Sequence, residues 1–119
     1  MANLTHTTDQ GVLVLRPAGG LDSAGAAAVA PAFRAAAPDG ARVVVDLSAV
    51  DFLATPGVTM LLTASRRLAE TGGRLVAAAA TPAVDQVIRR CRLDGVLRLT
   101  PTVAEGIVRA KASDVMREA

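Results

Sequence analysis

Aromatic residues are almost absent from this 119-residue sequence, which has two phenylalanines and neither tryptophan nor tyrosine. The hydrophobic core must therefore be aliphatic, and with 51% hydrophobic residues the chain has enough apolar side chains to build one. The net charge is only +2. These features argue against nucleic acid as a partner, because nucleic-acid binders combine a dense basic surface with aromatic side chains that stack on bases.

Cysteine and histidine occur once each, as Cys91 and His6. A single cysteine excludes an internal disulfide, and the two residues do not form a cluster with metal-ligand spacing. Asp46 and Asp51 resemble an acid–base pair, but no nucleophile or oxyanion site accompanies them, so we expect solvated carboxylates at strand ends. The sequence predicts no catalytic residues, no metal site and no cofactor.

Long apolar runs and a signal-peptide pattern are also missing from the sequence. The N-terminus lacks a basic start followed by an apolar segment, and the run Leu75–Ala80 is far too short to cross a bilayer. We therefore expect a cytoplasmic protein with no membrane insertion. The length suits a single domain that spans residues 1–119.

Alternating and continuous apolar runs, closed by Gly, Pro and Asp, predict strands. A short strand over 4–7 and a longer one over 11–20 form an opening hairpin, with Asp9, Gln10 and Gly11 as the turn. Three consecutive valines lie within 41–53, which predicts a strand covered on both faces. The further strands are expected within 72–80 and over 95–100.

Helical periodicity separates these strands. The expected helices lie over 24–37, over 56–71, from a Thr81 cap to 93, and after Thr102, with fraying from Ser113 onward. Pro31 interrupts the first helix, so we expect a kink there or a helix that begins nearer Pro31. Cys91 falls on the apolar stripe of the third helix and is expected to be buried. The pattern predicts an α/β fold, a mixed β-sheet of about five strands with about four helices.

Thr55 lies where strand-like sequence gives way to helical sequence, directly before Pro56. The simplest interpretation is that Thr55 is the N-cap of the helix and Pro56 its first residue. A second interpretation is that Thr55 accepts a phosphate, because free N–H groups and the helix dipole favour negative charge at this position. Asp22 likewise has two interpretations. In the first, it or Ser23 simply caps the following helix, and in the second Asp22 has a functional role.

Three segments resemble the STAS domain family, and specifically its single-domain anti-sigma factor antagonists. "GGLDSA" resembles the family's G-E-L-D turn, and "VVVDLSAVDFLATPGVTMLL" resembles its strand, phosphoacceptor loop and helix. "TGGRLVAAAATPAVDQVIRRCRLDGVLRL" resembles the later strand–helix–strand segment. The resemblance covers nearly the whole chain and implies a STAS-like fold.

Site residues follow from this resemblance. Thr55 matches the family's phosphoacceptor serine, Gly57 the motif glycine, and Asp22 the aspartate of the turn beside the partner surface. Asp46, Leu47 and Ser48 match the strand-end signature. The resemblance therefore implies a partner-binding site made of Asp22, Ala54, Thr55, Pro56 and Gly57.

Three positions depart from the family pattern. Ala54 replaces the acidic residue before the acceptor, Pro56 replaces the following hydroxyl residue, and Gly20 replaces the glutamate of the turn. Ala54 removes a charge that a kinase could recognise, and Pro56 removes one N–H donor from the first helical turn.

The resemblance implies an anti-sigma factor antagonist. Such a protein binds an anti-sigma factor with a histidine-kinase-like ATPase fold and frees a sigma factor, and phosphorylation of Thr55 would release the partner. The altered motif keeps an alternative open. In that case the domain is a constitutive subunit or scaffold that binds a transporter ATPase or a signalling complex without phosphorylation.

Five arginines occur in two groups. Arg89, Arg90 and Arg92 form one cluster, and Arg66 and Arg67 lie on another expected helix. The ordinary interpretation is that these are solvated helix faces. The alternative is a basic patch that steers an acidic partner and increases the association rate more than the affinity.

Overall fold

The computed structural model describes residues 2–112, so the expected fraying from Ser113 onward lies outside the described residues. The elements are, in chain order, β1 (Asn3–Asp9), β2 (Val12–Leu21), α1 (Ser23–Ala36), β3 (Arg42–Asp46), β4 (Val50–Leu53), α2 (Thr55–Glu70), β5 (Arg74–Ala78), α3 (Pro82–Arg90) and α4 (Val103–Lys111).

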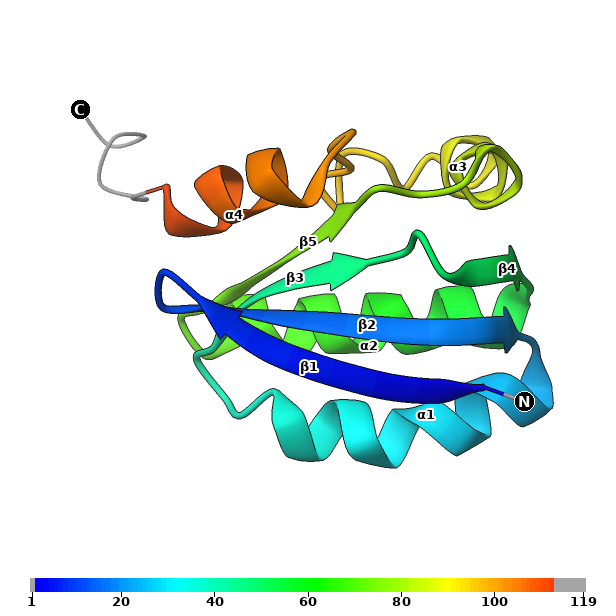
Figure 1. The fold of residues 1–119 in the computed structure, drawn as a ribbon, viewed down its shortest axis with the longest axis horizontal. Coiled ribbons are helices and arrows are strands. Elements are labelled where there is room, and N and C mark those ends of the chain that lie inside the picture. Colours follow the sequence, from blue (N-terminus) through cyan, green and yellow to red (C-terminus); the bar gives the residue numbers. More distant parts are fainter. Residues whose placement is uncertain (1, 113–119) are drawn as a thin grey trace.

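The sheet has five strands in the order β1-β2-β3-β5, and β4 pairs with β2 beyond the end of β3 (Figure 1). Strands β1 and β2 form the expected antiparallel hairpin, whose turn residues Gln10 and Gly11 both have positive φ. His6 lies on β1 and is exposed. The pairings β2–β3, β2–β4 and β3–β5 are parallel, so the predicted mixed α/β fold is confirmed.

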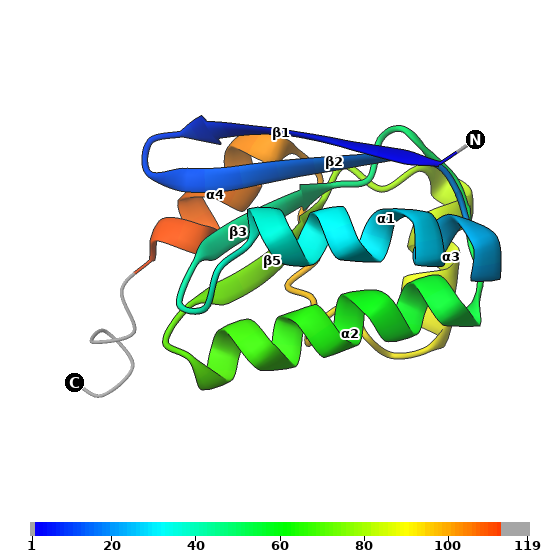
Figure 2. The same ribbon diagram turned by 90° about the horizontal axis from the view of Figure 1, so that it is seen from below.

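Helices cover both faces of the sheet. Helices α1 and α2 lie side by side on one face and α4 lies on the other (Figure 2). Val43 and Val45 belong to the larger core cluster with α1 and α2, whereas Val44 belongs to the smaller cluster with Ile107 of α4. The three consecutive valines are all fully buried because each face of β3 is covered, as predicted.

Two strand predictions need correction. The segment 41–53 contains two strands, because a turn over 47–49 separates β3 from β4 and allows β4 to pair with β2. The segment 95–100 is not a strand. It forms turns, with Leu97 N–H donating to Leu93 C=O at 2.8 Å. It contacts β5 through the isolated bridge between Ala78 and Thr100 and through the Ala77 N–H, which donates to the Leu97 C=O at 2.8 Å.

Helix α1 begins at Ser23 and contains Pro31 on its exposed face, so the alternative of a helix that begins nearer Pro31 is wrong, and the kink stays a prediction. Two side-chain predictions are also wrong. Cys91 is exposed because α3 ends at Arg90 and leaves Cys91 at the C-cap. Asp46 is only 8% exposed and pairs with Arg16 at 3.3 Å, whereas Asp51 is exposed as expected.

Within residues 2–112, no helix combines the length and the apolar character that a bilayer-spanning helix requires.

Candidate functional site

The candidate site lies where two paired strands end and two helices begin. Leu21 of β2 pairs with Leu53 of β4 in parallel, and the N–H of Ala54 donates to the C=O of Leu21 at 3.1 Å. Helix α1 follows directly after Leu21, and α2 follows after Leu53. Because parallel strands end at the same edge of a sheet, the Asp22 turn and the start of α2 come together.

Thr55 is the first residue of α2 and is not its N-cap, which corrects the sequence prediction. Ala54 is the N-cap, since its backbone is extended and its C=O accepts the N–H of Val58 at 3.0 Å. An alanine has no capping side chain, and no side chain of the described residues caps α2. The helix therefore begins one residue earlier than the Thr-Pro pattern predicts, and Pro56 is its second residue.

The Thr55 side chain therefore does not cap α2. It is exposed, and its hydroxyl forms no hydrogen bond with residues 2–112. The N–H groups of Thr55 and Gly57 belong to the first turn and have no acceptor within the helix, while Pro56 has no N–H. An anion on the Thr55 hydroxyl would meet two backbone donors and the positive end of the helix dipole.

Asp22 is the N-cap of α1, as one of its two interpretations predicted. Its carboxylate accepts the N–H of Gly25 at 2.8 Å, and the residue is exposed. The carboxylate thus supports the helix and also presents negative charge beside the start of α2.

A pair of substitutions separates the capping role of Asp22 from a partner-binding role. Asp22→Ala is expected to lower the free energy of unfolding by about 1 kcal/mol because the cap is lost. Asp22→Asn keeps the capping oxygen, so its stability should stay within a few tenths of a kcal/mol of the parent, roughly the spread among good caps. Urea unfolding measures both values, and equal losses for the two variants would contradict the cap.

Glycines hold both helix starts tightly against β2. Gly25 and Gly57 each occupy the third helical position. A Cβ on Gly25 would lie 1.8 Å from the C=O oxygen of Gly20, and a Cβ on Gly57 would lie 2.6 Å from that of Leu21. Neither distance is compatible with a side chain, so both helices approach the end of β2 more closely than any other residue would allow.

Phe52 is a site neighbour that the sequence analysis did not single out. A Cβ on Gly20 would lie 2.3 Å from the Phe52 ring, and Phe52 is 48% exposed. The position where the family pattern has a glutamate is therefore covered here by an exposed aromatic ring. The available signal was weak, since only the rarity of phenylalanine in this sequence marks Phe52.

The basic cluster of α3 is partly neutralised within the described residues. The Arg89 guanidinium donates to Asp85 at 2.9 Å and lies 3.8 Å from Asp94. The hydrogen bond and the charge of Asp85, with a smaller contribution from Asp94, raise the pKa of Arg89 above its ordinary value. Arg90 and Arg92 are exposed, so a steering patch on α3 stays a prediction.

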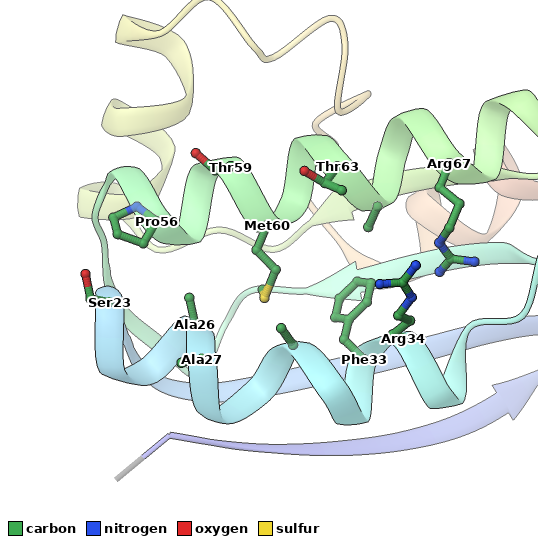
Figure 3. Close-up of a pocket in the computed structure, with 12 residues that line it drawn as sticks. Ser23, Ala26, Ala27, Phe33, Arg34, Pro56, Thr59, Met60, Thr63 and Arg67 are labelled. Atoms are coloured by element: carbon green, nitrogen blue, oxygen red, sulfur yellow. The ribbon is translucent and has the colours of Figure 1, made fainter.

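A groove extends from the candidate site along α1 and α2. It has a volume of about 420 Å³, and at one end it is bounded by Ser23 and Pro56, which adjoin Asp22 and Thr55 (Figure 3). We call it the α1–α2 groove. The sequence analysis did not predict it, because its existence depends on the spacing of two helices that are distant in the sequence.

The residues described, 2–112, contain no group of three or more His, Cys, Asp or Glu side chains placed to hold a metal ion.

The sheet order and the arrangement of the helices are those of the STAS fold. The family model described as "Mlab, STAS domain" matches residues 4–101, and the chain belongs to this family. Among curated proteins, none matches the sequence significantly.

Several solved structures share the fold. An anti-sigma factor antagonist from Mycobacterium paratuberculosis is 26% identical, with a TM-score of 0.85 over 94% of this chain and 96% of that one. An anti-sigma-factor antagonist (STAS) domain protein from Planctomyces limnophilus is 21% identical, with a TM-score of 0.77 over 92% and 98%. The antagonist SpoIIAA in its unphosphorylated form is 20% identical, with a TM-score of 0.71 over 95% and 100%.

Proposed function

We propose that this protein is an anti-sigma factor antagonist, a binding module and not an enzyme. It binds an anti-sigma factor with a histidine-kinase-like ATPase fold and thereby frees a sigma factor. The observation that carries the proposal is the exposed Thr55 hydroxyl at the first position of α2, beside Asp22 and without a hydrogen bond to residues 2–112. The similarity to a solved antagonist over 94% of this chain supports the same function.

Phosphorylation of Thr55 would change the partner surface without unfolding the domain. A phosphate adds nearly two negative charges, and at a helix N-terminus this charge is tolerated. A partner docked on Asp22, Ala54, Thr55, Pro56 and Gly57 would have to bury this anion and lose its hydration, which is costly without a dedicated counter-charge. The fold would persist while the complex dissociates.

The test is phosphorylation followed by mapping. The protein is incubated with ATP and each purified histidine-kinase-like ATPase of the source organism, and the modified residue is identified by mass spectrometry. We expect one phosphate, on Thr55, and none on the Thr55→Ala variant. Thr59 and Thr63 are exposed on the same helix and serve as internal controls. Phosphate on those residues, or no phosphate at all, would contradict the switch.

A second candidate function follows from Ala54 and Pro56, which alter the motif around the acceptor. In this alternative the same surface binds a transporter ATPase or a signalling scaffold constitutively. Affinity capture distinguishes the two functions. The alternative predicts that a transporter ATPase is the main partner and that the Thr55→Glu variant captures as much of it as the wild-type protein does.

A further inference from the structure

We propose that the α1–α2 groove receives an amphipathic helix of the partner, with apolar side chains in the groove and an acidic side chain against Arg34. This inference rests on the proposed function, because the groove begins at the candidate site. It extends the partner surface from the two helix starts along the length of both helices.

The shape of the groove comes from small side chains on α1. Ala26, Ala27 and Ala30 line the groove on its α1 side, where larger side chains would fill the space between the helices. Met60 of α2 points toward α1, and Phe33 is buried beneath the far half of the groove. The lining is thus largely apolar and leaves room for the large apolar side chains of another chain.

The length of the groove suits a helical segment. Along α2 it extends from Pro56 to Arg67, which is about 17 Å at the rise of an α-helix. An occupant helix of about three turns would cover this distance and present apolar residues at i, i+4 and i+7.

The charge of the groove is concentrated at one end. Figure 3 shows the guanidinium groups of Arg34 and Arg67 directed toward one another. Arg67 already donates to Asp39 and to the Ala37 C=O, both at 2.8 Å. Arg34 is exposed and forms no hydrogen bond or ion pair with residues 2–112.

This arrangement selects the charge of the occupant. A partner that covers Arg34 removes the water around its guanidinium, and an unpaired buried charge is costly. A carboxylate offers a charge-assisted, bidentate hydrogen bond that offsets this cost. A basic or wholly apolar occupant offers none, so the partner helix should carry Asp or Glu at the end of the groove distant from Thr55.

Matched variants test the groove on the domain itself. Ala27→Leu fills the groove, whereas Ala28→Leu adds the same side chain to the exposed face of α1 outside it. Arg34→Glu reverses the charge at the groove end, and Arg109→Glu makes the same change at an exposed position of α4, on the other face of the sheet. Calorimetric titration with the ATPase identified by the phosphorylation experiment should show that Ala27→Leu and Arg34→Glu lower the affinity for it at least tenfold. The affinity of the two control variants should stay within about twofold of the wild-type value, because substitutions outside an interface have small effects on binding.

A second probe keeps the test independent of that ATPase. A phage-displayed library of 18-residue helical peptides is selected on the wild-type domain. We expect enriched peptides with the i, i+4, i+7 apolar pattern and a terminal Asp or Glu, whose binding is lost with Ala27→Leu and kept with Ala28→Leu and Thr55→Ala.

The outcomes separate the two proposals. If the ATPase binding depends on Thr55 but is unchanged by Ala27→Leu and Arg34→Glu, the groove proposal is overturned and the proposed function stands. If no ATPase binds but the selected peptides have the expected pattern and mutant profile, the proposed function fails and the groove proposal stands. If light scattering shows a dimer that Ala27→Leu dissociates, the groove is covered by a second copy and the proposal is overturned. The groove proposal is also overturned if the selected peptides lack acidic residues or bind the Ala27→Leu variant as well as the wild-type domain.

Discussion

Thr55→Glu is expected to weaken binding of the anti-sigma factor by at least about 100-fold, equivalent to about 2.7 kcal/mol. The substitution places a carboxylate at the first position of α2, next to the Asp22 carboxylate and inside the proposed interface. A partner must then bury an extra negative charge, and a phosphate with nearly two charges should have a larger effect. Calorimetric titration of the purified pair measures the change.

Two control variants make this result specific. Thr8→Glu introduces the same charge at the hairpin end of β1, far along β2 from Leu21, and should leave the affinity unchanged within about twofold. Thr55→Ala removes the hydroxyl without adding charge and should bind nearly as well as the parent. A Thr55→Glu protein that keeps its affinity would exclude a charge switch at this residue and favour the constitutive alternative.

Gly25→Ala is expected to lower the free energy of unfolding by about 3 kcal/mol. Alanine is the better helix former by about 1 kcal/mol, which alone would stabilise α1. The new Cβ, however, would lie 1.8 Å from the C=O oxygen of Gly20, a backbone atom that cannot rotate away. The clash outweighs the helix preference because either α1 or the end of β2 must move.

Gly95→Ala is the matched control for this prediction. A Cβ on Gly95 has nothing within 4 Å, and Gly95 is not among the glycines with positive φ. Its stability should therefore stay within about 0.5 kcal/mol of the parent. Urea unfolding measures the free energy of unfolding of both variants. Equal values would mean that the start of α1 can move away from β2 without loss of stability.

Most of the fold follows from local patterns in the sequence. The valines of β3, the Gln10–Gly11 turn and the Thr81 cap each use short-range chemistry that the sequence displays directly. The sequence patterns did not predict β4 as a separate strand, because only a short turn separates it from β3 within one apolar stretch. The segment 95–100 has alternating leucines, yet it forms turns because the N–H groups of Leu97 and Leu99 donate to the C=O groups of Leu93 and Asp94.

The start of α2 was predicted less accurately than the fold. The parallel ends of β2 and β4 place the Asp22 turn next to the start of α2, but the helix start is displaced by one residue because Ala54 C=O already accepts the first helical hydrogen bond. The roles of Asp22 and Thr55 in partner binding stay predictions. Contacts between distant segments were not predictable from spacing. The ring of Phe52 over Gly20 and the α1–α2 groove both depend on how separate elements approach one another.

The residues that fix the scaffold are different from those that shape the groove. Gly25 and Gly57 are locked by the end of β2, whereas Ala27 and Arg34 are exposed and can vary at little cost to folding. Under the function and the groove proposed here, related domains within one cell could thus acquire separate partners through changes along the groove alone, with the same proposed acceptor position in each. Crosstalk between parallel signalling routes would then be limited by steric and charge mismatch in the groove and not by differences in the proposed switch.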